Sequence, residues 1–230
     1  MNKNAIQKFA VWARNELIEQ VKQRAYQYGI RENNYDEAHN VIIAGRVLTN
    51  LEAHQQHDFV KLISQTGYQQ AVEEVAYTWF NRFIALRFME VNDYLPTHIR
   101  VFSDANGGFN PEILKDVLHL DLEGLDKVKV SELLNANQTE ELYRYLLLTQ
   151  CNALNAGLPE VFERLGGYTE MLLPNTDFHG IEPTLNKPGK ALSVKAKKAH
   201  RFNENRMSKR MITFDYLGLQ NEVFRVLFKC

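Results

Sequence analysis

Hydrophobic residues recur at intervals of three and four positions along most of the chain before its basic C-terminal part. In the first such run Ile6, Phe9 and Ala13 begin a pattern that continues for about six turns, which predicts an amphipathic helix over residues 4–28. Gly29 follows the last apolar position. Because glycine readily adopts the left-handed conformation that ends many helices, we expect Gly29 to cap this helix.

Two shorter helices are predicted next. The apolar spacing that begins with Val41 and Ile42 predicts a helix over residues 36–54. A separate short helix is expected over residues 58–65, ending before Gly67.

The stretch EVAYTWFNRFIALRFMEVNDYLP, residues 74–96, is unusually rich in large side chains. It predicts a helix over residues 69–91 that stops before Pro96, whose ring cannot continue the hydrogen-bond ladder. On a helical wheel Thr78, Asn81 and Arg82 fall on one polar side, and apolar residues occupy most of the rest. A helix of this kind is expected at the centre of its domain, so its aromatic residues are interpreted as core.

Arg87 is an exception because it lies within the apolar part of this wheel. A buried guanidinium is costly unless it is paired, and Glu90, one turn further along, is the predicted partner in a structural ion pair. The alternative is that Arg87 lines a groove and contacts a phosphate.

Segments after residue 96 also predict helices. SDANGGFNPE, residues 103–112, reads as a polar loop in which Asn110 and Pro111 should start the next helix. Asn137 precedes Glu140 by the spacing of a capping box, which predicts a helix over residues 137–156. Residues 98–103 offer the one tempting short strand. The predicted fold is therefore mainly α, a multi-helix orthogonal or bundle-like domain.

Charge divides the chain into two parts. The 230 residues carry a formal net charge of −1, but residues 1–185 hold 16 Lys and Arg against 25 Asp and Glu, and residues 186–230 hold 11 against 3. We therefore expect a helical domain over 1–185, followed over 186–230 by a partly flexible basic linker and a short C-terminal helix. The basic part could bind nucleic acid or could be a solvated linker. Its candidate DNA-binding residues are Lys195, Lys197, Lys198, Arg201, Arg206, Lys209 and Arg210.

Several kinds of site and location are disfavoured. The N-terminus lacks the apolar run of a secretory signal, and no 18-residue apolar stretch predicts a membrane span. With two cysteines and no disulfide framework, the expected location is the cytoplasm. His54, His57 and Asp58 have helical metal-ligand spacing but are more typical of a solvated helix end, so no metal is expected. The motifs of common hydrolases and nucleotide-binding loops are missing from the sequence.

Three long segments carry a family resemblance. FAVWARNELIEQVKQRAYQYGI (9–30), VAYTWFNRFIALRFMEVNDYLP (75–96) and ELYRYLLLTQCNALNAGLPEVFERLGGYTEMLLP (141–174) together resemble the N-terminal helical region of PglX methyltransferases. These are the adenine-specific DNA methyltransferases of type 1 BREX phage-defence systems. The resemblance covers roughly residues 1–175.

The resemblance implies transfer of a methyl group from S-adenosylmethionine to the N6 atom of adenine in DNA. That chemistry needs a flipped base held by an Asn/Asp-Pro-Pro-Tyr/Phe loop and a glycine-containing turn for the cofactor. Here Asn110 and Pro111 are followed by Glu112 and Ile113, so the loop is incomplete and the glycine turn is missing. We therefore expect neither a catalytic centre nor a cofactor site in this chain.

Two hypotheses follow. In the first, the chain is the helical N-terminal part of a BREX adenine methyltransferase and acts in assembly or DNA engagement, with DNA, other BREX components or the methyltransferase domain as partners. In the second, it is a stand-alone helical protein of phage defence that binds DNA or acts as a regulator or scaffold.

Overall fold

The computed structural model describes residues 3–35, 42–43, 46–105, 110–115, 117–164 and 166–174. Within these residues six α-helices, one 3-10 turn and one two-stranded hairpin form the fold, which confirms the mainly α prediction. Their bounds are α1 Lys3–Gln27, β1 Ile42–Ile43, β2 Arg46–Val47, α2 Asn50–Thr66, α3 Tyr68–Val91, η1 Glu112–Leu114, α4 Lys127–Asn135, α5 Thr139–Leu154 and α6 Tyr168–Met171. The predicted basic linker and helix over 186–230 lie outside the described residues.

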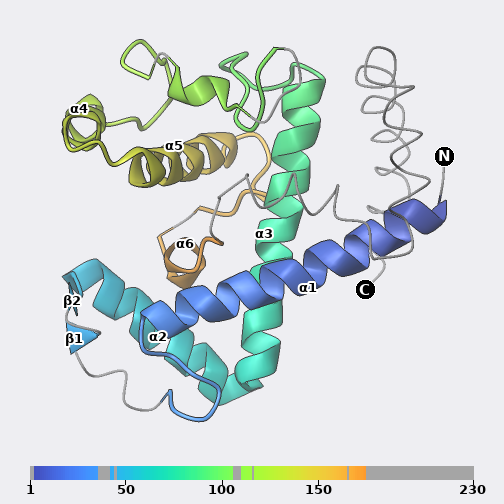
Figure 1. Ribbon diagram of the computed structural model, residues 1–230, viewed down its shortest axis with the longest axis vertical. Coiled ribbons are helices and arrows are strands. Elements are labelled where there is room, and N and C mark those ends of the chain that lie inside the picture. The colour runs from blue at the N-terminus through green and yellow to red at the C-terminus, as the bar shows by residue number, and fades with distance from the viewer. Residues whose placement is uncertain are drawn as a thin grey trace, which may run out of the picture.

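Helix α3 is the central element of the domain. α1 crosses it and packs on it, α2 packs beside its N-terminal half, and α4 and α5 form a layer near its C-terminal half (Figure 1). The short α6 packs on α2 and lies between α5 and α1 (Figure 1). Among the described helices, none is both long enough and apolar enough to cross a membrane.

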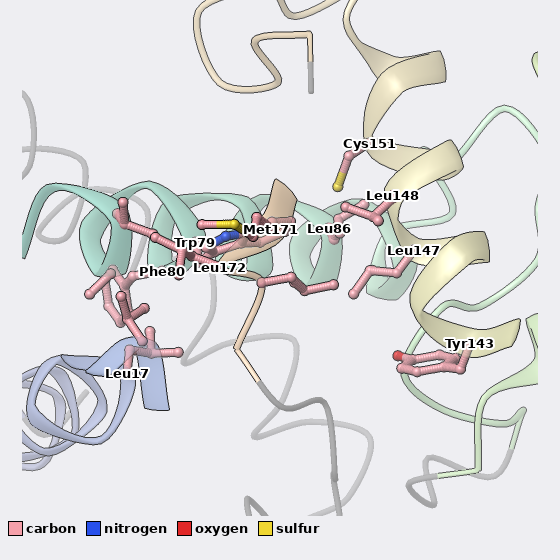
Figure 2. Packing of buried hydrophobic residues seen from close by; sticks show 14 of the residues in the cluster. Leu17, Trp79, Phe80, Leu86, Tyr143, Leu147, Leu148, Cys151, Met171 and Leu172 are labelled. Carbon is pink, nitrogen blue, oxygen red and sulfur yellow. The ribbon is translucent and has the colours of Figure 1, made fainter. Parts of the chain in front are cut away.

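The core extends along both sides of α3. Figure 2 shows Leu17 of α1 beside Phe80, whereas Leu147 and Leu148 of α5 lie beside Leu86, near the other end of the helix. All five side chains are buried. α3 thus joins the α1 side of the domain to the α5 side through one continuous apolar core.

The structure confirms that α3 is a central helix, but the burial of two of its side chains differs from the prediction. Trp79 and Phe80 are buried, as expected for core residues, but the side chain of Tyr77 is 43% exposed. Arg82 was expected on the polar side and is in fact only 2% exposed. The prediction for Arg82 is wrong because a non-helical segment, described below, covers that side of α3.

The two helices predicted between residues 36 and 65 have the wrong boundaries. Ile42–Ile43 pairs antiparallel with Arg46–Val47, and α2 then runs without a break from Asn50 to Thr66. Its start is fixed by a capping box at Thr49: the Thr49 hydroxyl accepts a hydrogen bond from Glu52 N at 3.2 Å, and Thr49 N donates to the Glu52 carboxylate at 2.9 Å. The apolar residues before Thr49 therefore belong partly to a hairpin.

Gly29 has the expected left-handed conformation, with φ 75°, although α1 itself ends at Gln27. A Cβ at Gly29 would come within 3.1 Å of Ile43 Cδ1, so the hairpin packs closely on the turn that follows α1.

The capping box predicted at Asn137 is wrong. Asn137 has φ 54° in the turn after α4, and α5 begins at Thr139 without a side-chain cap. α4, Lys127–Asn135, was not predicted from the sequence; Asp126 is its N-cap, and Asp126 Oδ1 accepts from Val128 N at 2.8 Å.

Residues 98–103 are not a strand but an irregular segment. Asn110 and Pro111 precede only the 3-10 turn η1, and no side chain caps that turn. In place of a strand partner, the Glu90 side chain accepts from Val101 N and Phe102 N, and the carbonyls of Arg100 and Ser103 accept from Ile113 N and Glu112 N of η1.

Candidate functional site

The end of α3 carries a buried carboxylate rather than the expected buried guanidinium. Arg87 and Glu90 form an ion pair, in which the Glu90 side chain is fully buried and that of Arg87 is 18% exposed. Glu90 also accepts hydrogen bonds from Val101 N at 2.8 Å and Phe102 N at 2.6 Å. The pair thus anchors the irregular segment after α3; a role for Arg87 at a phosphate stays a prediction.

Two hydroxyl groups complete this network. Ser103 Oγ donates to Glu90 at 2.9 Å, and Arg87 Nη1 donates to Ser103 Oγ at 2.9 Å. Tyr143 of α5 donates to the Val101 carbonyl at 3.1 Å. Burial, together with the nearby Glu90 charge, raises the pKa of the Tyr143 phenol well above its ordinary value, so the phenol remains a neutral donor.

A second polar network holds residues 161–164 and 166–174, which we call the anchored segment. Arg82 Nη2 donates to the Glu163 carbonyl at 3.0 Å and Arg82 Nε to the Val161 carbonyl at 3.4 Å. The Arg82 guanidinium also lies over the ring of Trp79, with its central carbon 5.2 Å from the ring centroid.

Trp79, Gln55 and Arg144 bind the second half of the anchored segment. Trp79 Nε1 donates to the Thr169 carbonyl at 2.9 Å, and Gln55 Nε2 donates to the Gly166 carbonyl at 3.1 Å. Arg144 donates to the carbonyls of Glu170, Met171 and Leu173, and so caps the C-terminal end of α6. Side chains from α2, α3 and α5 therefore hold the anchored segment, including the short α6, against the domain.

The side-chain donors described above bind backbone carbonyls. The side chains that could take part in covalent chemistry or metal binding lie elsewhere in the domain. Cys151 is fully buried, and burial raises the pKa of its thiol to about 12, which keeps it protonated and unreactive at neutral pH. His54 Nε2 lies 3.5 Å from Asp58 Oδ2 on an exposed part of α2. Across the residues that the structure describes, no group of three or more His, Cys, Asp or Glu side chains could hold a metal ion.

The predicted DNA-binding residues lie outside the described residues. They are Lys195, Lys197, Lys198, Arg201, Arg206, Lys209 and Arg210.

The roles of Arg82 and Arg144 in positioning backbone were not predicted from the sequence. The available signal was an arginine inside a strongly apolar helical run, as in RYLLLTQC, because such a guanidinium must find acceptors elsewhere in the fold.

Comparison with known proteins identifies related chains. The sequence is 33% identical over 205 residues to the adenine-specific methyltransferase PglX of Lacticaseibacillus casei (strain Zhang), which covers 79% of this chain and 17% of the relative. It is 35% identical over 191 residues to the adenine-specific methyltransferase BrxX of Escherichia coli O9:H4 (strain HS), which covers 76% of this chain and 16% of the relative. The chain is homologous to a segment of these methyltransferases.

This homology confirms the resemblance to PglX and is consistent with a PglX-like N-terminal region. The chain spans about a sixth of the length of the PglX and BrxX relatives. No family model matches the sequence.

Proposed function

We propose that this chain is the helical N-terminal part of a site-specific adenine-N6 DNA methyltransferase of a BREX phage-defence system, without a catalytic centre of its own. The observation that carries the proposal is the identity of 33–35% to two adenine-specific methyltransferases over about three-quarters of the chain. The incomplete Asn110-Pro111 loop supports the second half of the proposal, because adenine methylation needs a loop that grips the flipped base.

In this proposal the helical domain acts in assembly. Four side chains from three different helices hold the carbonyls of the anchored segment. A segment fixed in this way gives the following chain a defined starting point on the domain. The domain would then hold the methyltransferase part in a defined orientation, in a complex that works in the cytoplasm on DNA.

The cofactor belongs to the methyltransferase part in this account. S-adenosylmethionine titrated into the purified chain should release no binding heat, and the chain alone should transfer no methyl group to DNA. Micromolar binding of S-adenosylmethionine would overturn the proposal. Binding of the chain to the rest of a PglX or BrxX relative on a sizing column would support assembly, and separate elution would count against it.

A second candidate role is engagement of DNA by the basic part of the chain. It is favoured by the excess of 11 Lys and Arg over 3 Asp and Glu in residues 186–230. Binding through phosphate contacts weakens steeply as salt rises, because counterions are released from DNA. Deletion of residues 186–230 should therefore abolish a salt-dependent affinity for duplex DNA. Equal affinity without these residues would exclude this role.

A further inference from the structure

One side of α3 carries large apolar side chains that stay in contact with solvent. Tyr77 is 43% exposed, and Ile84, Phe88 and Val91 are half-buried. These four residues follow one another at intervals of seven, four and three positions, so they lie along one side of the helix. At a rise of 1.5 Å per residue, the row from Tyr77 to Val91 is about 21 Å long.

Tyr94 extends this row beyond the end of the helix. Its ring lies 5.7 Å from that of Phe88, centroid to centroid, although Tyr94 is 61% exposed. The chain turns back there because Asp93 has φ 58°, and Tyr94 N donates to the Met89 carbonyl at 2.7 Å. Backbone bonds thus hold Tyr94 beside Phe88, and we call the four helical residues together with Tyr94 the α3 stripe.

Local packing explains only part of the α3 stripe. A left-handed residue after a helix commonly returns an apolar side chain onto the last turn, which accounts for the contact of Tyr94 with Phe88. Single exposed apolar residues are also ordinary on protein surfaces. Neither reason explains large apolar side chains aligned over about four turns, because the outer side of a surface helix is normally polar. The α3 stripe is therefore suited to packing against another amphipathic element.

Residues 211–230, MITFDYLGLQNEVFRVLFKC, have an apolar pattern that fits such a stripe. Apolar residues repeat there at intervals of three and four positions, at Ile212, Tyr216, Leu219, Val223 and Leu227. This spacing predicts an amphipathic helix. Its apolar side would extend about 22 Å from the first of these residues to the last, close to the length of the row on α3.

Charge and reach favour this segment as the element that packs on the α3 stripe. Residues 1–185 hold 16 Lys and Arg against 25 Asp and Glu, whereas residues 186–230 hold 11 against 3, so the two parts attract each other. A coil of the length of residues 175–210 extends about 30–36 Å, enough to bring residues 211–230 alongside α3. Because both surfaces belong to one chain, a modest affinity is enough for them to stay bound.

We propose that residues 211–230 dock as an amphipathic helix along the α3 stripe. Docking covers the apolar side of α3 and ties the basic residues between 186 and 210 to the acidic domain as a closed loop. The proposal concerns contacts within this chain, and it holds whether or not the chain acts on DNA.

Thiol labelling tests this docking in the full-length chain with Cys230→Ser, in which Cys151 is buried. The thiol introduced by Tyr77→Cys should react slowly while residues 211–230 cover it. Leu219→Asp with Val223→Asp places charges on the docking side of that segment. These two changes should speed the labelling about tenfold, as expected when a surface open for a tenth of the time becomes open throughout.

Two further measurements guard against a general effect of the substitutions on folding. The matched control is Tyr26→Cys, in the last turn of α1, where the tyrosine is 57% exposed. Its labelling rate should be the same with and without the two aspartate changes. In a chain that stops after Arg210, adding a peptide of residues 211–230 should slow the labelling of Tyr77→Cys again.

Equal labelling of Tyr77→Cys with and without the two aspartate changes would overturn the docking, and so would an equal change at Tyr26→Cys. Slow labelling that disappears on dilution would assign the α3 stripe to a second copy of the chain instead. Slow labelling that requires the remaining part of the BrxX relative would assign it to the methyltransferase part. Either of these results would also overturn docking of residues 211–230.

Discussion

Glu90→Gln should destabilise the fold more than the same exchange at an exposed acid. The Glu90 carboxylate is fully buried and accepts hydrogen bonds from two backbone N–H groups, from Ser103 Oγ and from Arg87. Glutamine has nearly the same size and shape but replaces one acceptor oxygen by an NH₂ group. That group must face at least one N–H donor, and the charge of Arg87 loses its counterion.

The expected magnitude follows from these contacts. Breaking a buried ion pair by removing one partner costs about 3–5 kcal/mol. Arg87 is 18% exposed and can recover part of its hydration, so we expect a loss near the lower end, about 3 kcal/mol. This is a large share of the roughly 5–15 kcal/mol that stabilises a typical domain.

Urea unfolding followed by circular dichroism measures this loss as a lower midpoint at an unchanged slope. The control is Glu73→Gln, because Glu73 pairs with Arg14 at 2.6 Å on the surface and such pairs contribute about 0–1 kcal/mol. If Glu90→Gln lost less than about 1 kcal/mol, no more than the control, the reasoning about the buried carboxylate would be refuted.

Three further predictions concern other parts of the domain. Thr49→Ala removes the capping box of α2 and should lower the free energy of unfolding by about 1 kcal/mol in urea; an unchanged midpoint would contradict this. In a Cys230→Ser background, Cys151 should react with a thiol reagent only after unfolding, because it is buried and its pKa is about 12; rapid labelling of the native chain would contradict this. The pKa of Tyr143 is raised in the folded state above 10.0, so its stabilising contribution is complete below pH 10.0 and is lost as the pH rises further. Tyr143→Phe should therefore reduce the alkaline loss of stability, and an identical alkaline loss in both chains would count against it.

Helical periodicity predicted the long helices of this domain well, because their apolar stripes are local features of the sequence. The helix predicted over residues 69–91 matches α3, Tyr68–Val91, and its core role is confirmed by Trp79 and Phe80. The same pattern failed before α2, where apolar residues of a hairpin imitate helical spacing. The capping box at Thr49 was the local signal that would have placed the start of α2 correctly.

The polar networks could not be predicted from local patterns. Arg82 and Arg144 bind carbonyls of the anchored segment, and these acceptors lie 26–81 positions away in the chain. The sequence marks each arginine as unusual in its helix but does not say where its acceptors lie. The ion pair of Arg87 with Glu90 could be predicted because the two residues are one turn apart on the same helix.

The most direct test of the central claim uses the E. coli relative BrxX in three forms: full-length, without the 191-residue segment matched here, and with that segment replaced by this chain. The measurement is N6-methyladenine formed in DNA with S-adenosylmethionine. The account predicts that the deletion abolishes methylation and that the replacement restores it. Full activity of the deleted form, or a replacement no more active than the deletion, would contradict the account.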